Sequence, residues 1–105
     1  MKTILRALFV VLVLALVFST YTFAEGGADT FKAKCAACHG ATGKGDTTMG
    51  KNLKIRDLSS ADVQKQSDAD LNTIISAGKN KMPAYKGKVT DEQIGELVKY
   101  IRTLK

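Results

Sequence analysis

The sequence predicts an all-α domain of three to five short helices around one core, preceded by an N-terminal export signal. Three observations predict this fold class. Apolar residues recur at helical spacing, helix-capping residues precede the periodic segments, and no segment shows the alternation typical of a β-strand. With 105 residues, the chain has room for one domain only.

The first 24 residues have the order of parts found in secretory signals. Two basic residues precede an unbroken apolar run at 7–18, and Thr22 and Ala24 put small residues where a signal peptidase reads the chain. The run is shorter than the roughly 20 residues that a membrane-spanning helix needs. We therefore expect a signal peptide over residues 1–24 and a mature domain over residues 25–105. An uncleaved membrane anchor is the alternative.

The mature domain would keep 81 residues, with 14 basic and 10 acidic side chains, and its lysines form no dense run. This charge pattern excludes a nucleic-acid-binding protein but permits an acidic partner. In so short a chain, apolar burial barely offsets conformational entropy, so small domains usually need a bound group or a cross-link. We expect something besides side chains to complete this core.

Two helical segments are expected in the first half of this domain. The first runs from a cap at Asp29 through Cys35, and glycines then mark an irregular loop over residues 40–50. A short helix that carries Val63 is expected to start at one of the serines at 59–60.

Two stronger helices are expected in the second half. Ser67 opens a helix that stops at Gly78, and Thr90 with Gln93 forms a capping box at the start of the last helix. The apolar residues of that last helix follow i, i+3, i+4, i+7 spacing: Ile94, Leu97, Val98, Ile101 and Leu104.

The chemistry of the chain is concentrated in Cys35-Ala36-Ala37-Cys38-His39. On a helix the two thiols point to one side, where they can form thioethers with the two vinyl groups of a haem, and His39 lies under the iron. A structural zinc site needs four ligands, and this motif offers three. A thioredoxin-like pair needs a βαβ context, and a disulfide leaves His39 unexplained. The motif therefore predicts one covalently attached haem c.

With this motif, residues 25–105 resemble the small class I c-type cytochromes of bacteria. Gly27 and Phe31 stand eight and four residues before the first cysteine, as in the first helix of that family. The Leu-Val-Lys-Tyr-Ile segment near the C-terminus is similar to the family's last helix. The resemblance implies a cytochrome c fold in which these helices cross closely at Gly27, with Phe31 packed against Leu97 and Tyr100.

The resemblance also implies a second axial ligand to the iron. Met82-Pro83-Ala84-Tyr85 resembles the family's distal-ligand motif and lies 43 residues after His39, in a loop over residues 79–89. The other methionine of the mature domain, Met49, is ten residues from His39, too near to reach the opposite face of a haem, and is expected to fill the core.

Two features depart from the family pattern. Many relatives place a proline after the attachment motif, and its carbonyl accepts a hydrogen bond from the histidine ligand; here residues 46–50 lack it, and the acceptor stays open. Tryptophan is absent, so the haem propionates need other donors, for which Asn52, Lys54 and Arg56 are candidates.

The resemblance implies a soluble monomeric electron carrier that has no catalytic residues. His39 and Met82 would fill both axial positions, and methionine ligation raises the reduction potential. Such a carrier would shuttle one electron between periplasmic or membrane redox partners. Two rivals remain: an enzyme or gas sensor with an open iron position, and a membrane-anchored haem module of a larger oxidase or reductase.

Four lysines flank the predicted distal ligand and suggest how a partner docks. No acidic residue lies between Gly78 and Val89, whereas acids occur on the last helix. An ordinary solvated face is the alternative to a docking surface for an acidic redox partner. The lysines are Lys79, Lys81, Lys86 and Lys88.

Overall fold

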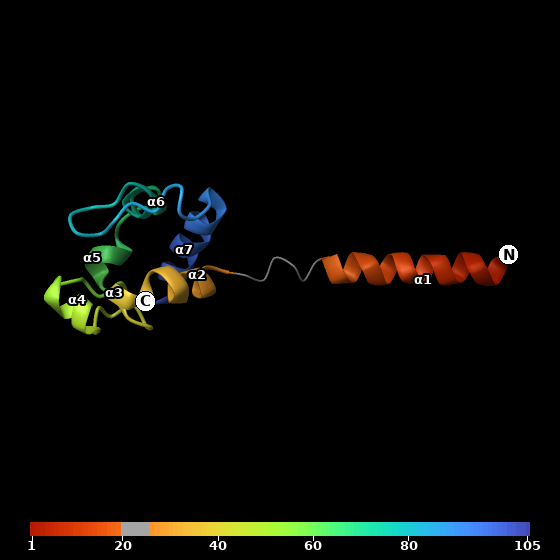
Figure 1. Cartoon of the computed structure of the whole chain (residues 1–105), viewed down its shortest axis with the longest axis horizontal. Helices are drawn as coiled ribbons and strands as arrows, with labels where there is room; N and C mark the ends of the chain where they lie inside the picture. Colours follow the sequence, from red (N-terminus) through yellow and green to blue (C-terminus); the bar gives the residue numbers. More distant parts are fainter. Residues whose placement is uncertain (20–25) are drawn as a thin grey trace.

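The computed structural model describes residues 1–19 and 26–105, and for residues 13–19 it describes the helical backbone alone. The described chain is helical, with two isolated β-bridges and no longer strand (Figure 1). This confirms the all-α fold class, although the described part of the domain has six helices rather than the three to five that were predicted. The helices are α1 Lys2–Ser19, α2 Gly27–Lys34, α3 Ala36–His39, α4 Thr48–Asn52, α5 Ala61–Gln64, α6 Asp68–Ala77 and α7 Asp91–Thr103.

The N-terminal helix α1 carries a row of exposed apolar side chains, among them Ile4, Leu5, Leu8 and Phe9. Searched over the described residues, no helix is long and apolar enough to cross a membrane. The predicted cleavage point after Ala24 lies outside the described residues.

The first helix of the domain differs from the predicted one at both ends. It begins at Gly27 with Gly26 as N-cap, so Asp29 lies in the first turn rather than at the cap. There its carboxylate still interacts favourably with the positive end of the helix dipole. The helix ends at Lys34, and Cys35 joins α2 to α3 with a φ of −116°.

A short helix that the sequence did not predict, α4, forms inside the glycine-rich segment. Thr47 caps it by accepting a hydrogen bond from the Gly50 amide at 2.9 Å, and the same hydroxyl donates to the Cys38 carbonyl at 3.1 Å. A Cβ on Gly50 would lie 2.5 Å from that carbonyl oxygen, so glycine lets α4 pack closely on α3. The neighbouring Met49 turns outward and is 51% exposed. The prediction that Met49 fills the core is wrong.

Helices α5 and α6 follow the predicted capping residues. Ser60 precedes α5, whose Val63 is buried. The Ser67 side chain accepts a hydrogen bond from the Asp70 amide at 3.0 Å at the start of α6, and Gly78, with a φ of +77°, ends it. Local capping chemistry therefore fixes where α6 begins and ends, whereas the Ser60 side chain makes no capping hydrogen bond to α5.

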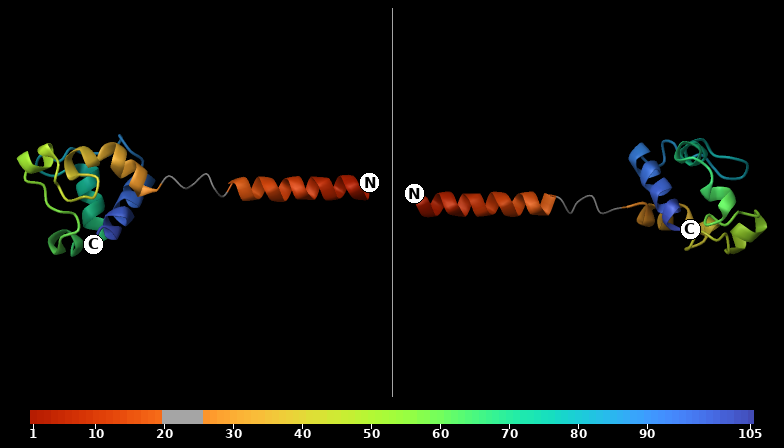
Figure 2. Two further views of the ribbon diagram at one scale, coloured as in Figure 1. Left: turned by 90° about the horizontal axis from the view of Figure 1, so that it is seen from below. Right: turned by 180° about the vertical axis from the view of Figure 1, so that it is seen from behind.

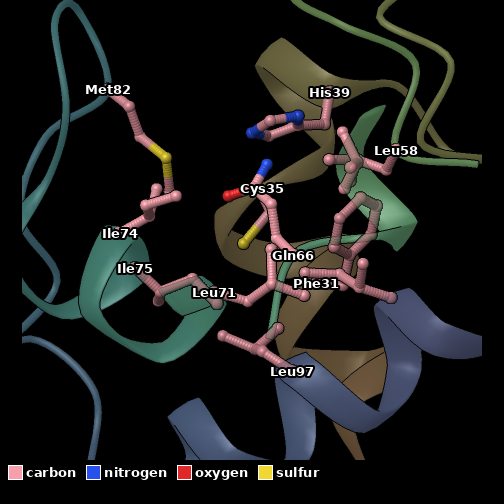
Figure 3. A pocket seen from close by; sticks show the side chains of 12 residues that line it. Phe31, Cys35, His39, Leu58, Gln66, Leu71, Ile74, Ile75, Met82 and Leu97 are labelled. Carbon is pink, nitrogen blue, oxygen red and sulfur yellow. The ribbon is translucent and has the colours of Figure 1, made fainter. Parts of the chain in front are cut away.

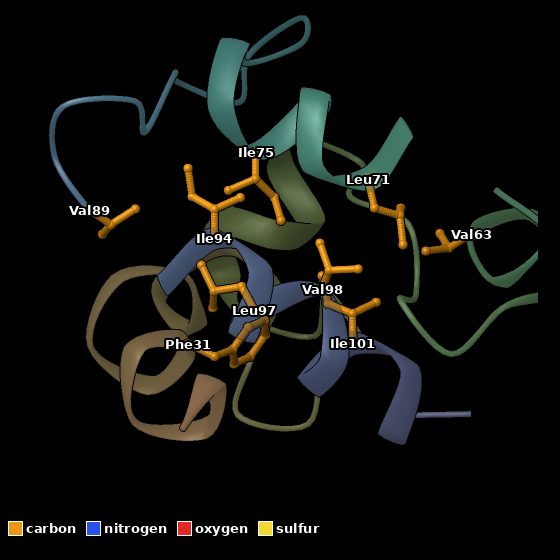
Figure 4. Close-up of a cluster of buried hydrophobic side chains, with 9 residues drawn as sticks. All are labelled: Phe31, Val63, Leu71, Ile75, Val89, Ile94, Leu97, Val98 and Ile101. Atoms are coloured by element: carbon orange, nitrogen blue, oxygen red, sulfur yellow. The ribbon is translucent and has the colours of Figure 1, made fainter. Parts of the chain in front are cut away.

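The last helix, α7, lies at the centre of the core. Its capping box is complete: the Gln93 amide donates to Thr90 Oγ1 at 3.1 Å, and the Thr90 amide donates to Gln93 Oε1 at 2.8 Å. Its apolar face packs against α2 and α6 (Figure 4). The buried apolar cluster comprises Phe31, Val63, Leu71, Ile75, Val89, Ile94, Leu97, Val98 and Ile101.

Helices α2 and α7 cross at the close contact that the resemblance implied (Figure 2). A Cβ on Gly27 would collide with the backbone carbonyl of Glu96 and would lie 2.8 Å from Tyr100 Cβ. The Phe31 and Tyr100 rings lie next to this point, with centroids 5.1 Å apart. Glycine is therefore required for the two backbones to approach.

Substitutions at this crossing test how much it contributes to the stability of the fold. Gly27→Val is expected to lower the free energy of unfolding by about 1–3 kcal/mol through overpacking. Phe31→Ala should lower it by about 3–5 kcal/mol by leaving a cavity. Denaturant unfolding of the haem-loaded protein measures both. Gly26→Val is the matched control, because a Cβ there meets nothing within 4 Å. Losses below about half a kcal/mol at Gly27 and Phe31 would contradict this account of the crossing.

The C-terminal end of α7 is tied to the segment that joins α5 and α6. The Arg102 guanidinium donates to the carbonyls of Gln64 and Gln66 and pairs with Asp68 at 2.9 Å. The Gln64 amide donates in turn to the carbonyls of Leu58, at 2.8 Å, and Ile101, at 3.0 Å. These bonds fix the α5–α6 segment, which forms one wall of the site described next.

Candidate cofactor-binding site

A cleft opens between the α2–α3 segment on one side and α6 with its following loop on the other (Figure 3). Its inner part has a volume of about 120 Å³ and its outer part about 420 Å³. Five residues line both parts, so they form one continuous space: Cys35, His39, Gln66, Ile74 and Met82.

The inner part of the cleft is apolar and is lined by residues of five helices. Phe31 comes from α2, Val63 from α5, and Leu97 from α7. Gln66 is the one amide among these walls. Apart from the five shared residues, the inner lining is Phe31, Leu58, Val63, Leu71, Ile75, Leu97 and Ile101. A space with such walls suits a large apolar group that must be shielded from water.

The imidazole of His39 projects into the cleft from the end of α3. Its backbone is held on both sides, since its amide donates to Cys35 at 2.9 Å and its carbonyl accepts from Gly45 at 2.7 Å. Burial lowers the pKa of His39, which favours the neutral ring that can bind a metal. The Phe31 ring lies 6.2 Å from the imidazole, between centroids.

The buried Nδ1 atom of His39 has no hydrogen-bond partner among the described residues. No carbonyl in residues 46–50 takes the place of the proline carbonyl found in many relatives. A buried polar atom without a partner is costly in a finished core. The acceptor for His39 that the sequence left open is therefore not found among the described residues.

The two cysteines lie beside this histidine as free thiols. Burial raises the pKa of the Cys35 thiol to about 11, and the neighbouring Cys38 adds to the shift. A thiol with so high a pKa stays protonated at neutral pH and is a poor nucleophile. Within the described residues, no group of three or more His, Cys, Asp or Glu side chains could hold a metal ion. These residues do not supply the ligands of a structural zinc site.

Met82 reaches the cleft from the opposite side, on the loop after α6 (Figure 3). A tight turn presents it: the amides of Lys79 and Met82 each donate to the other's carbonyl, at 3.1 and 3.0 Å. Asn80 adopts a φ of +54° within the turn, a conformation that asparagine tolerates better than most residues. The structure thus brings His39, Cys35 and Met82 to one cleft and leaves Met49 outside it.

The outer part of the cleft is basic. Of the three candidates for propionate binding, Lys54 and Arg56 line it and Asn52 does not. No acidic residue is among its described lining residues. Its cationic side chains come from three segments of the chain: Lys34, Lys54, Arg56, Lys79 and Lys81.

These features together fit a haem. A flat apolar ring would be enclosed by the inner walls, and its two carboxylates would meet the cations of the outer part. An imidazole and a thioether sulfur face each other across the space, beside a pair of thiols. Sequence reasoning missed Lys34, Leu58 and Gln66 as lining residues. They carry no motif, and only the tertiary packing brings them to the cleft.

Comparison with known proteins agrees with this geometry. The family model described as cytochrome c oxidase, cbb3-type, subunit III matches residues 23–101. Cytochrome c6 of Nostoc sp. (strain PCC 7120) is 32% identical over 92% of this chain and 92% of its own length. Cytochrome c6 of Porphyra purpurea is 34% identical over 96% of this chain and 93% of its own length.

A solved structure shares the fold as well. The c-type cytochrome KustC0563 superposes with a TM-score of 0.71 at 32% identity, covering 76% of this chain and 98% of its own. Proteins of this kind hold one covalently attached haem c and carry electrons rather than catalyse a reaction on a substrate. The chain belongs to the cytochrome c family, as a small class I c-type cytochrome that carries single electrons on one haem c.

Proposed function

We propose that Cys35 and Cys38 form the two thioether bonds to the haem and that His39 and Met82 are the axial ligands of its iron. The observation that carries this proposal is the placement of the His39 imidazole and the Met82 sulfur on facing sides of one apolar cleft (Figure 3). In this account the chain transfers one electron between periplasmic or membrane redox partners.

The protein's contribution is to bind, orient and shield the group. Bound haem supplies the one-electron iron couple. His39 and Met82 would both hold the iron, and together they would leave no position for oxygen or peroxide. The inner walls exclude water, which together with methionine ligation favours the reduced state. Lys54 and Arg56 would receive the propionates, and their place in the lining of the outer part supports this role.

We further propose that residues 1–24 are a signal peptide removed on export, with cleavage after Ala24. The exposed apolar side chains of α1 support this, because contiguous apolar surface of this kind marks a segment that meets a membrane or a processing machinery. A second candidate is a haem module of a larger oxidase that keeps residues 1–24. The description of the matching family model favours this candidate.

The absorption spectrum and the mass of the purified protein test both parts of the proposal. A low-spin spectrum with the charge-transfer band of methionine-ligated ferric iron is expected, together with a mass equal to residues 25–105 plus one haem. A high-spin spectrum that shifts at once with carbon monoxide would point to an open iron position instead. A mass that includes residues 1–24 would favour the anchored module.

The partner proposal rests on the lysines around Met82. All four lysines are exposed, and none of them is in an ion pair with a described residue. Lys79 and Lys81 also line the outer cleft, where an electron would leave the haem. We propose that these lysines guide an acidic partner to the haem edge, acting mainly on the association rate.

Charge reversal tests this docking surface. Lys81→Glu or Lys86→Glu is expected to slow bimolecular electron transfer to an anionic partner, and to slow it more at low salt than at high salt. Salt has this effect because the Debye length falls to about 8 Å at physiological ionic strength. Lys105→Glu, at the far end of the chain, is the matched control and should change the rate much less. Equal changes in rate at all three sites, or rates that do not depend on salt, would mean that these lysines form an ordinary solvated face and no docking surface.

A further inference from the structure

We propose that the Tyr85 hydroxyl is a latch that holds the Met82 loop closed over the haem, so that Tyr85 is a positioning residue for the distal ligand. This inference rests on the proposed ligation by Met82. It concerns how firmly the loop keeps that ligand in place, which ligation alone does not determine.

The latch is a hydrogen bond across the cleft. The Tyr85 hydroxyl donates to the carbonyl oxygen of Lys34 at 3.0 Å, over 51 positions of sequence. Lys34 is the last residue of α2 and directly precedes Cys35, the first residue of the attachment motif. One end of the bond therefore lies beside the haem attachment, and the other lies three residues after Met82.

The acceptor is available because the helix is broken at Cys35. In a continuous helix, the amide of Cys38 would donate to the Lys34 carbonyl. Here that amide donates to Cys35 at 3.2 Å instead. The Lys34 carbonyl is thus one of the unpaired groups at a helix C-terminus, which need a partner from elsewhere. Tyr85 supplies that partner.

The other hydrogen bonds of the loop to the rest of the fold join it to α6, on the same side of the cleft. The Tyr85 amide donates to Ile75 at 3.0 Å and the Lys86 amide donates to Ser76 at 3.1 Å, both in α6. Within the described residues, no other hydrogen bond joins residues 79–89 to residues 27–39. If the loop moves away from the haem with α6 in place, the Tyr85–Lys34 bond is therefore the one that must break.

The variant Tyr85→Phe isolates the hydroxyl. The aromatic ring stays, and with it the packing of residue 85 against the core and the contact with Lys88, whose Nζ lies 5.6 Å from the ring centroid. Tyr100→Phe is the matched control. It also removes one phenolic hydroxyl, from a ring that packs at a tilt of 51° against Phe31. Among the described residues, this hydroxyl makes no hydrogen bond to the Met82 loop.

Imidazole added to the oxidised holoprotein measures the strength of the latch, because it competes with Met82 for the iron and can bind only when the loop opens. Tyr85→Phe is expected to lower the imidazole concentration for half-displacement by about 2- to 10-fold, the range that one hydrogen bond contributes. The loss of the methionine-to-iron absorption band gives the readout. Tyr100→Phe should leave the midpoint unchanged.

The outcomes separate this inference from the proposed function. Wild-type protein without the methionine-to-iron band would overturn Met82 ligation itself. A normal band with equal midpoints in Tyr85→Phe and wild type would overturn the latch alone, even if Tyr85→Phe melts at a lower temperature.

A second measurement uses the wild-type protein, so it still tests the latch if Tyr85→Phe is produced without haem. In an imidazole titration followed by NMR, the Tyr85 ring signals should shift in step with the loss of the iron-bound Met82 methyl signal. Tyr85 signals that stay constant while Met82 leaves the iron would overturn the latch.

Discussion

Replacing both attachment cysteines, in Cys35→Ala/Cys38→Ala, is expected to leave residues 25–105 largely unfolded. The proposed thioethers would hold the haem in the cleft, and a group that binds only the folded state contributes its binding free energy to folding. Without the haem, the apolar inner walls would face water instead of the macrocycle. Residues 25–105 contain no disulfide and have little other apolar burial to offset that loss.

Circular dichroism with thermal melting measures this effect. The double variant should show weak helical signal and no cooperative transition, whereas the wild-type holoprotein should melt sharply. Ala37→Ser is the matched control, because it changes an exposed residue of the same motif and keeps both thiols. A sharp, native-like melt of the double variant would show that side-chain packing alone is sufficient for the fold.

The helices that the sequence predicted best are those that local chemistry specifies. The capping box of Thr90 and Gln93 satisfies amide groups within a few residues of itself, so it acts whatever the rest of the fold does. Ser67 and Gly78 bound α6 for the same reason. Each of these signals can be recognised without knowledge of tertiary contacts, and the structure confirms each of them.

The features that the sequence did not predict depend on contacts between distant segments. The break at Cys35 turns the attachment motif toward the cleft, and no propensity of Cys35 or Ala36 indicates it. Helix α4 forms because Thr47 bonds both to Gly50 and to the Cys38 carbonyl. Its close packing on α3 leaves Met49 exposed, which no pattern in residues 40–50 shows.

The candidate site was predictable to a similar degree. The motif and the loop methionine, with a resemblance to guide them, were sufficient to select Cys35, His39 and Met82, which the structure brings to one cleft. The residues that form the walls of the cleft were not predictable from the sequence. Gln66 is held at the cleft because Arg102, more than 30 positions away, donates to its carbonyl. Leu58 is held there by the Gln64 side chain, which also bonds to α7.

Met82→Ala is expected to abolish the methionine-to-iron absorption band and to lower the reduction potential of the haem. Alanine has no donor atom, so the iron would lose its sulfur ligand, and with it the stabilisation that methionine gives to the reduced state. The open position would accept water or an added ligand. The side chain of Met82 also packs against the core cluster, so the variant should bind haem but unfold more easily than wild type.

Met49→Ala is the matched control, since it removes the same thioether from the same domain. Met49 is 51% exposed on α4, and neither part of the cleft includes it in its lining. Its loss should leave the band and the potential nearly unchanged. Absorption spectra and redox titrations of both variants give the comparison. If the band disappears in Met49→Ala and persists in Met82→Ala, the distal ligand comes from α4, and the loop after α6 has another role.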